Sequence, residues 1–185
     1  MRVISGKARG ARLFAPKGTK TRPTADFVKE ALFNILAADI RDADFLDLFA
    51  GSGAIGIEAI SRGARSCVFI DNNRDAIDAI RKNLDKTRLG ADAEVVCANM
   101  QKALAGLNRQ FDIIFADPPY NQNLAYPAIN DISKYNLLAK NGIIVIEMAK
   151  SDTPDNPAEL GFEIFKTKKY SSGQLIFFRH LEDAL

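Results

Sequence analysis

The sequence is poor in the side chains that most often bind metals or form cross-links. Its 185 residues include two cysteines, one histidine and no tryptophan. Cys67 and Cys97 both lie in apolar, strand-like runs, which favours buried free thiols over a disulfide. His180 stands alone, so no clustered pattern of metal ligands exists. We therefore expect neither a metal nor a disulfide framework.

Long apolar runs are also missing. None approaches the roughly 20 residues that a membrane-spanning helix needs. The first ten residues contain no apolar stretch of the kind found in secretory signals. We expect a cytoplasmic protein with one compact domain, because 185 residues can bury a sizeable core but hardly two. Nothing in the sequence requires more than a monomer.

Acidic residues are absent from the first 25 positions, which carry seven basic ones. The basic residues are Arg2, Lys7, Arg9, Arg12, Lys17, Lys20 and Arg22. The rest of the chain holds 18 basic and 23 acidic residues, a net charge of −5. A basic, glycine-containing arm on a slightly acidic body favours contact with a polyanion. From charge alone, a solvated tail is the alternative.

Strand and helix patterns alternate along the chain. Short strand-like pieces at residues 2–5 and 12–14 predict a hairpin, and Thr24 is a good N-cap for the helix that follows. Further strands are expected at 45–49, 66–71, 93–97, 111–117, 142–148, 162–170 and 174–180. Helices are expected at 54–62, 73–87, 100–107 and 124–135. We divide the chain into a hairpin arm, residues 1–23, and one domain, residues 24–185.

The first five strands of the domain are near-continuous apolar runs, which indicates a parallel sheet covered on both faces. The last two, separated by a short Ser-Ser-Gly turn, predict an antiparallel hairpin. An open, mostly parallel sheet binds its ligand beyond the carboxyl ends of its strands. Phe14, Phe27 and Phe33 fit core or hairpin packing better than base stacking.

A glycine loop follows the first of these strands. Gly51, Gly53 and Gly56 fit the G-x-G-x-x-G spacing, and Asp71 closes the next strand 20 residues after Gly51. This fingerprint fits a nicotinamide-dependent oxidoreductase as well as a methyltransferase, and a tight turn without a ligand is the third alternative. Asp47 favours S-adenosylmethionine, because a carboxylate repels a pyrophosphate but attracts an ammonium or sulfonium group. Alternatively, Asp47 braces the loop.

The fourth of these strands ends in Asp117-Pro118-Pro119-Tyr120. The exocyclic amine of a nucleic-acid base is a poor nucleophile, since its lone pair is delocalised into the ring. The carboxylate of Asp117 and the carbonyl of Pro118 can accept its two hydrogens and stabilise the charge that develops during methyl transfer. Tyr120 can stack on the base and align it. A proline-rich turn with Tyr120 in the core is the alternative.

These motifs leave four functions to compare. A methyltransferase of an exocyclic base amine in RNA and a DNA or RNA adenine-N6 methyltransferase share the same chemistry, but reading a DNA sequence normally needs an added recognition region. A nicotinamide-dependent oxidoreductase leaves the Asp-Pro-Pro-Tyr segment unexplained. A non-catalytic RNA-binding module conflicts with the intact Asp117 and Tyr120. The first hypothesis accounts for most of the pattern.

Taken together, the motifs resemble the bacterial RsmD family, the 16S ribosomal RNA guanine-N2 methyltransferases. The matching segments are MRVISGKARGARL, TRPTADFVKEALFNIL, FLDLFAGSGAIGIEAISRGA, FIDNNRDAIDAIRKNL, FDIIFADPPY and KKYSSGQLIFF. The resemblance implies a Rossmann-like class I methyltransferase fold, α/β, with a seven-stranded, mostly parallel sheet whose last strand is antiparallel. It also implies S-adenosylmethionine as donor, S-adenosylhomocysteine as product, and a guanine of the small ribosomal subunit or its assembly intermediate as acceptor.

The resemblance also assigns residues. Contacts to the cofactor fall on Gly51, Ser52, Gly53, Asp71 and Asn72. Asp117, Pro118 and Tyr120 would hold the guanine, and Arg22 and Thr24 would lie near the cofactor's amino-acid end or the target. Where the family usually has an aspartate near the adenine, this chain has Asn99, whose carbonyl can still accept a hydrogen bond. In this context the basic residues Arg2, Lys7, Arg9, Arg12 and Arg22 are predicted to contact RNA phosphates.

Overall fold

A computed structural model describes residues 1–16, 26–119, 124–152, 156–171 and 173–181. Seven strands form one sheet in the order β3-β2-β1-β4-β5-β7-β6. They are β1 (Asp44–Leu48), β2 (Ser66–Asp71), β3 (Ala93–Cys97), β4 (Phe111–Ala116), β5 (Leu138–Met148), β6 (Phe162–Lys169) and β7 (Gln174–His180). β1 to β5 are parallel, and β7 is antiparallel to both β5 and β6. The predicted sheet, with its antiparallel last strand, is confirmed.

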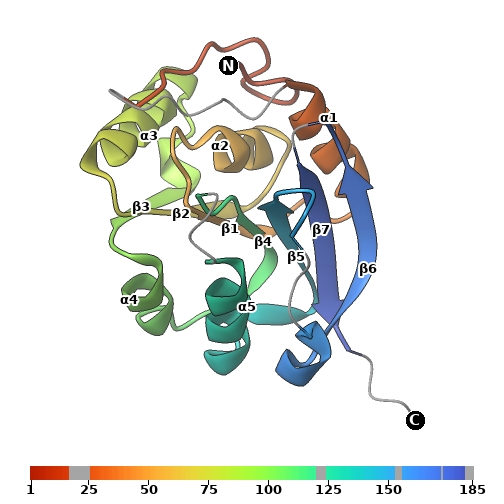
Figure 1. Ribbon diagram of the computed structural model, residues 1–185. Helices are drawn as coiled ribbons and strands as arrows, with labels where there is room; N and C mark the ends of the chain where they lie inside the picture. The colour runs from red at the N-terminus through yellow and green to blue at the C-terminus, as the bar shows by residue number, and fades with distance from the viewer. Residues whose placement is uncertain (17–25, 120–123, 153–155, 172, 182–185) are drawn as a thin grey trace.

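Helices cover both faces of this sheet (Figure 1). α1 (Asp26–Ile35), α2 (Ala54–Ser61) and α3 (Arg74–Thr87) lie on one face, and α4 (Met100–Ala105) and α5 (Ala125–Lys134) lie on the other. Two short 3₁₀ helices, η1 (Gly90–Asp92) and η2 (Pro157–Leu160), complete the described elements. The buried apolar residues accordingly form two clusters, one on each face of the sheet.

Local chemistry explains where α3 begins and ends. The side chain of Asn73 accepts a hydrogen bond from the backbone N–H of Asp75 at 2.8 Å and so caps the first turn. Arg88 closes the last turn in the left-handed conformation, with φ of 58°. Apolar residues recur at the helical period, so one face of α3 is buried against β2 and β3. The polar face stays in solvent.

The fifth strand is longer than its apolar run predicted. It begins at Leu138 rather than at residue 142, and its pairing with β4 shifts register between Phe111 and Ile113. The extension contains the exposed Lys140 and Asn141, which interrupt the apolar pattern. A register shift lets such polar residues join a strand without entering the core.

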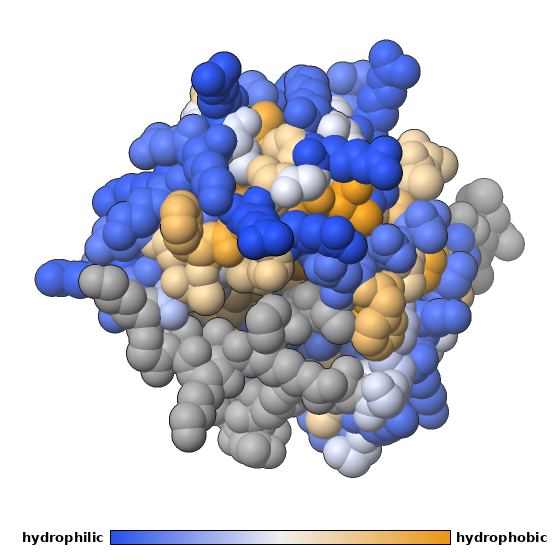
Figure 2. Space-filling model, turned by 90° about the horizontal axis from the view of Figure 1, so that it is seen from above, coloured by the Kyte–Doolittle hydropathy of each residue, from blue (hydrophilic) through white to orange (hydrophobic). Residues whose placement is uncertain are grey.

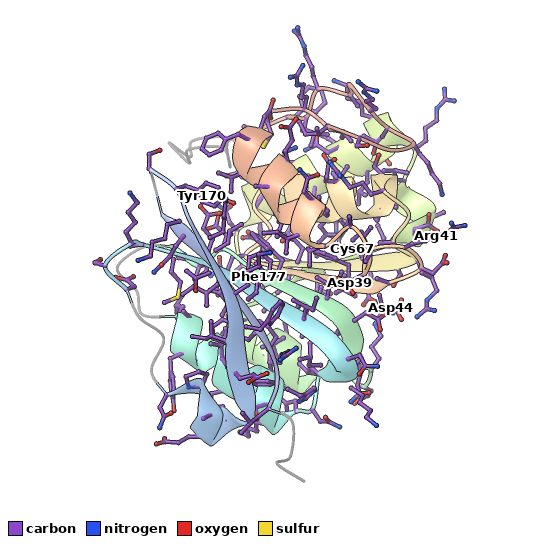
Figure 3. All side chains as sticks on the ribbon, turned by 90° about the vertical axis from the view of Figure 1, so that its right-hand side faces the viewer. Asp39, Arg41, Asp44, Cys67, Tyr170 and Phe177 are labelled. Atoms are coloured by element: carbon purple, nitrogen blue, oxygen red, sulfur yellow. The ribbon has the colours of Figure 1, made fainter. Side chains whose placement is uncertain are left out.

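One expectation about the cysteines is wrong. Cys67 is buried and free, as expected, and Figure 3 labels it in the interior of the molecule. Cys97 is also free but exposed. It ends β3, which is the edge strand of the sheet, so a neighbouring strand covers only one side of it. The three phenylalanines expected to pack in the core or the hairpin differ in exposure. Phe33 is buried, whereas Phe14 and Phe27 are each 50% exposed.

The N-terminal arm closes with a single antiparallel bridge, between Arg2 and Arg12, rather than with two full strands. Backbone bonds from Val3 to Ala11 and from Leu13 to Met1 flank the bridge. Other N–H groups of the arm bond to side chains of α2 instead of to a second strand. The buried Val3 and Leu13 join the core, so the arm packs on α2 and α3 (Figure 1).

Within the described ranges, no helix combines the length and the hydropathy that a membrane crossing requires.

Candidate active site

The candidate site lies where neighbouring strands send their chains to opposite faces of the sheet. β1 leads into α2 on one face, and the adjacent β4 leads toward α5 on the other. The backbone N–H of Asp117 donates to the carbonyl of Leu48 at 3.4 Å, which joins the two strand ends. Such reversal points leave a crevice at the carboxyl edge of a sheet, where α/β proteins bind their ligands.

The glycine loop after β1 has an unusual backbone. Phe49, Gly51 and Gly53 all have positive φ, of 59°, 55° and 74° respectively. Positive φ suits glycine but is uncommon for a phenylalanine, and such residues concentrate at functional sites. A side chain at Gly56 would place its Cβ 2.3 Å from Cε1 of Phe69, so glycine alone permits this approach of α2 to β2.

Two carboxylates hold the loop in this shape. Asp71, at the end of β2, accepts hydrogen bonds from the N–H groups of Gly51 and Asn73, both at 2.8 Å. Asp47, only 2% exposed, accepts one from Gly56 at 2.9 Å. This is the loop-bracing arrangement that the sequence left open for Asp47. A Cβ on Gly51 would meet only the Phe49 carbonyl, at 3.9 Å, so the loop is open beside that residue.

The carboxylates around the crevice repel one another. Burial raises the pKa of Asp47 well above its usual range, and the nearby Asp117 and Asp71 raise it further. Burial raises the pKa of Asp117 to about 8, with a smaller contribution from Glu147. A ligand that carries positive charge favours the ionised form of these carboxyl groups, whereas a dinucleotide pyrophosphate disfavours it. The chemistry of these residues therefore fits S-adenosylmethionine better than NAD.

The other predicted cofactor residues surround the loop with different exposures. Ser52 is 8% exposed, and its hydroxyl donates to the sulfur of Met1 at 3.4 Å. Asn72 is exposed next to Asp71. Asn99 is the N-cap of α4, where its side-chain oxygen accepts from the N–H of Lys102 at 2.9 Å. The second lone pair of this oxygen is not used by that hydrogen bond and can accept one from an adenine amine.

The predicted target residues are only partly described. Pro118 is buried directly after the partly buried Asp117. Tyr120, Arg22 and Thr24 lie outside the described residues. Among the described basic residues of the arm, Arg2, Lys7, Arg9 and Arg12 lie at the surface. Figure 2 looks onto this side of the molecule and shows hydrophilic side chains around smaller apolar patches.

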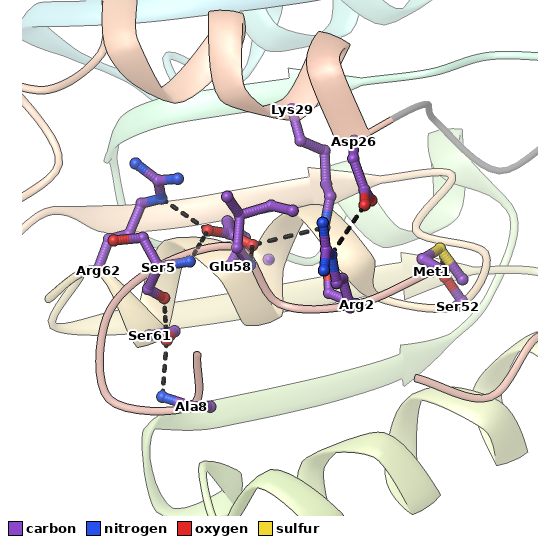
Figure 4. A network of polar contacts seen from close by, with 12 residues as sticks. Met1, Arg2, Ser5, Ala8, Asp26, Lys29, Ser52, Glu58, Ser61 and Arg62 are labelled. Carbon is purple, nitrogen blue, oxygen red and sulfur yellow. Dashed lines mark hydrogen bonds and ion pairs between the residues drawn. The ribbon is translucent and has the colours of Figure 1, made fainter. Parts of the chain in front are cut away.

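A buried ionic network that the sequence analysis missed holds the arm on α2 (Figure 4). Glu58 accepts hydrogen bonds from the N–H groups of Ile4 at 2.7 Å and Ser5 at 3.0 Å, and from Nε of Arg62 at 2.7 Å. Lys29, also fully buried, pairs with Glu58 at 3.4 Å and donates to the carbonyl of Arg2. A glutamate in an otherwise apolar, fully buried helix was the signal for such a network.

No group of three or more potential metal ligands was found among the residues that the structure describes.

The reversal point between β1 and β4, the glycine loop and the strand order define a class I methyltransferase of the α/β type. Solved structures of methyltransferases share this fold. An Escherichia coli protein provisionally named as the methyltransferase yhhF matches with a TM-score of 0.85 and 34% identity, covering 97% of both chains. An RNA methyltransferase from Pyrococcus horikoshii, also provisionally named, matches with a TM-score of 0.73 at 16% identity, covering 94% of both chains, which shows the fold alone.

Sequence comparison narrows the class to a family. The family described as conserved hypothetical protein 95 matches residues 1–179. The ribosomal RNA small subunit methyltransferase D of Escherichia coli K12 is 39% identical over 159 residues, covering 85% of this chain and 80% of its own. A Bacillus subtilis protein provisionally named as the rRNA methyltransferase YlbH is 43% identical over 150 residues, covering 80% and 82%. The chain belongs to this family, the RsmD family.

Proposed function

We propose that this protein transfers the methyl group of S-adenosylmethionine to the exocyclic N2 amine of a guanine in 16S ribosomal RNA. The observation that carries the proposal is the position of Asp117 and Pro118 at the end of β4, beside the glycine loop that follows β1. The names of relatives, ribosomal RNA small subunit methyltransferase D, support the substrate class.

Two acceptors of this chain would activate the amine. The carboxylate of Asp117 and the carbonyl of Pro118 accept its two hydrogens, favour a more tetrahedral nitrogen and stabilise its developing positive charge. The rigid proline backbone holds this pair in place without reorganisation. S-adenosylmethionine, when bound, supplies an electrophilic methyl group. Tyr120 is proposed to stack on the base and orient it.

The geometry of the glycine loop indicates which residues would bind the methyl donor. Gly51, Ser52 and Gly53 offer close backbone approach, and Asp71 and Asn72 lie at the end of β2 for the ribose. Asn99 is proposed to accept a hydrogen bond from the adenine amine. A positive charge in the crevice lowers the pKa of Asp117 from about 8, so the carboxylate is ionised when it is needed.

Methyl transfer to defined substrates tests the proposal. Small subunits from cells that lack this activity, protein-free 16S rRNA and duplex DNA are each incubated with labelled donor, and nucleosides are identified by mass spectrometry. We expect N2-methylguanosine, formed faster on subunits than on protein-free RNA, because a shallow arm favours a substrate held by its shape. N6-methyladenosine, or transfer to the duplex alone, would overturn the proposal.

A thermal-shift assay shows whether the protein binds a product of the methyl donor or a nicotinamide cofactor. We expect S-adenosylhomocysteine to raise the melting temperature and NAD to leave it unchanged. The reverse result would favour the oxidoreductase.

A further inference from the structure

The arm exposes an aromatic ring to solvent, and its backbone is joined through Asn83 to the glycine loop that follows β1. Phe14 is 50% exposed, although Leu13 directly before it is buried. One exposed apolar residue carries little meaning by itself. Phe14 differs from an ordinary surface residue in the way its backbone is held.

A single buried side chain fixes the backbone of Phe14 on both sides. The side-chain oxygen of Asn83 accepts from the Phe14 N–H at 2.7 Å, and its amide nitrogen donates to the Phe14 carbonyl at 3.0 Å. Asn83 itself is fully buried on α3. The backbone that carries the ring is therefore fixed before any ligand arrives, which reduces the entropy lost on binding.

The same side-chain amide also connects the backbone of Phe14 to the glycine loop. The Asn83 nitrogen also donates to the carbonyl of Ser52, at 2.9 Å. Phe14 thus lies within the reach of one side chain from the glycine loop. Asn83 therefore bridges the backbone of Phe14 to the glycine loop.

A cation completes the surface. The Lys86 ammonium lies 4.6 Å from the centre of the Phe14 ring, and the exposed Lys82 is on the same helix. The exposed Arg12 and Arg9 come from the arm itself. An exposed aromatic ring beside a cation, on a fixed backbone, matches the chemistry of an unpaired nucleotide, whose base stacks while its phosphate is neutralised.

We propose that Phe14 and Lys86 form a stacking platform for an unpaired base of the RNA substrate, near the nucleotide that is methylated. This inference rests on the proposed function, because it takes the partner to be RNA. Asn83 is a positioning residue for this platform and does not itself contact the base.

The absence of tryptophan makes the platform directly observable. Phe14→Trp introduces a sole tryptophan at the platform, and stacking of a base on it quenches its emission. The matched control is Phe165→Trp on β6, since Phe165 is 38% exposed and also lies near a cation, Arg179, at 5.5 Å from its centre. Each variant is titrated with an unpaired RNA dodecamer, with the same sequence as a duplex, and with small ribosomal subunits.

We expect the unpaired RNA and the subunits to quench Trp emission in Phe14→Trp, the duplex to quench it much less, and the Phe165→Trp signal to stay constant. Phe14→Leu should weaken binding of the unpaired RNA about fivefold or more by fluorescence anisotropy. Equal affinities of wild type and Phe14→Leu, with no quenching in Phe14→Trp, would overturn the platform alone. A wild-type protein that binds neither RNA nor subunits would overturn the proposed function as well.

Discussion

At the scale of single residues, the proposed chemistry depends on the charge of Asp117. Its carboxyl group has a pKa of about 8 in the folded protein, raised mainly by burial. In the unfolded chain the same group titrates near pH ~4. Between these pH values the folded state holds a proton that the unfolded state releases. The contribution of Asp117 to stability therefore falls as pH rises, and becomes constant above about pH 8.

Asp117→Asn tests this pH dependence. The amide does not titrate, so the variant should gain stability relative to wild type as pH increases from about 5 to 8.5, by a few degrees in melting temperature. Thermal unfolding at several pH values measures the difference. A difference that stays constant over this range would show that Asp117 is not held in its protonated form.

The two thiols should react very differently. Cys97 is exposed, whereas Cys67 is buried and burial raises its pKa well above the usual range. Since the thiolate is the reactive form, a thiol reagent should modify Cys97 alone rapidly in the native protein and both thiols after denaturation. Mass spectrometry of the modified peptides identifies the site. Rapid native modification of Cys67 would contradict the packing of β2 against α2.

At the scale of elements, the arm depends on one buried glutamate. Glu58 pairs with Lys29, and both side chains are fully buried. Burial lowers the pKa of Lys29, which Glu58 partly offsets. Removing the carboxylate would leave the ammonium and the N–H groups of Ile4 and Ser5 without their partner.

Glu58→Ala should therefore lower the free energy of unfolding by about 3–5 kcal/mol and release the arm. Urea unfolding measures the first effect, and tryptic cleavage after Arg9 or Arg12 measures the second. The control is Ser61→Ala, which loses only neutral hydrogen bonds to Ala8 and Ser5 and should cost about 1 kcal/mol. Equal effects of the two substitutions would mean that the ionic network does not anchor the arm.

The sequence predicted the elements whose patterns are uniform. Strands β2 and β3 begin and end where their apolar runs do, and Asp71 falls at the predicted edge of the sheet. β5 was predicted too short, since Lys140 and Asn141 belong to it only through a register shift. Such a shift depends on the neighbouring strand and leaves no trace in the local pattern.

The site was predicted less completely than the fold. Motif spacing located Asp117 and the glycine loop, because both follow strands directly. The roles of Glu58 and Asn83 depend on contacts with the arm, which is distant in sequence. Both are polar residues on buried helix faces, which indicates that a partner is needed but not which one.

At the scale of the whole molecule, charge is separated between the arm and the body. The arm packs on α2 and α3, on one side of the sheet (Figure 1), and its Lys7, Arg9 and Arg12 are exposed. The far edge carries a second basic strand, β6, with Lys166, Lys168 and Lys169. We expect RNA at the candidate site to contact the arm, because Asn83 joins the arm to the glycine loop, whereas β5 and β7 separate β6 from β4.

Salt dependence distinguishes these two basic surfaces. Replacing Lys7, Arg9 and Arg12 by glutamine should reduce the slope of log affinity against log salt by about 0.7 for each phosphate that is no longer neutralised. Replacing the three lysines of β6 should leave the slope unchanged. Filter binding at several salt concentrations measures both. A larger effect of the β6 substitutions would place the RNA at the β6 end of the sheet.

The proposed mechanism requires Asp117 to promote methyl transfer at the reversal point between β1 and β4. The decisive test is the single-turnover rate of methyl transfer to small ribosomal subunits, compared between wild type and Asp117→Ala at saturating donor. We predict a loss of about a hundredfold or more, with donor binding retained, because the variant removes an acceptor used in the transition state. An unchanged rate in Asp117→Ala would show that this carboxylate takes no part in the reaction.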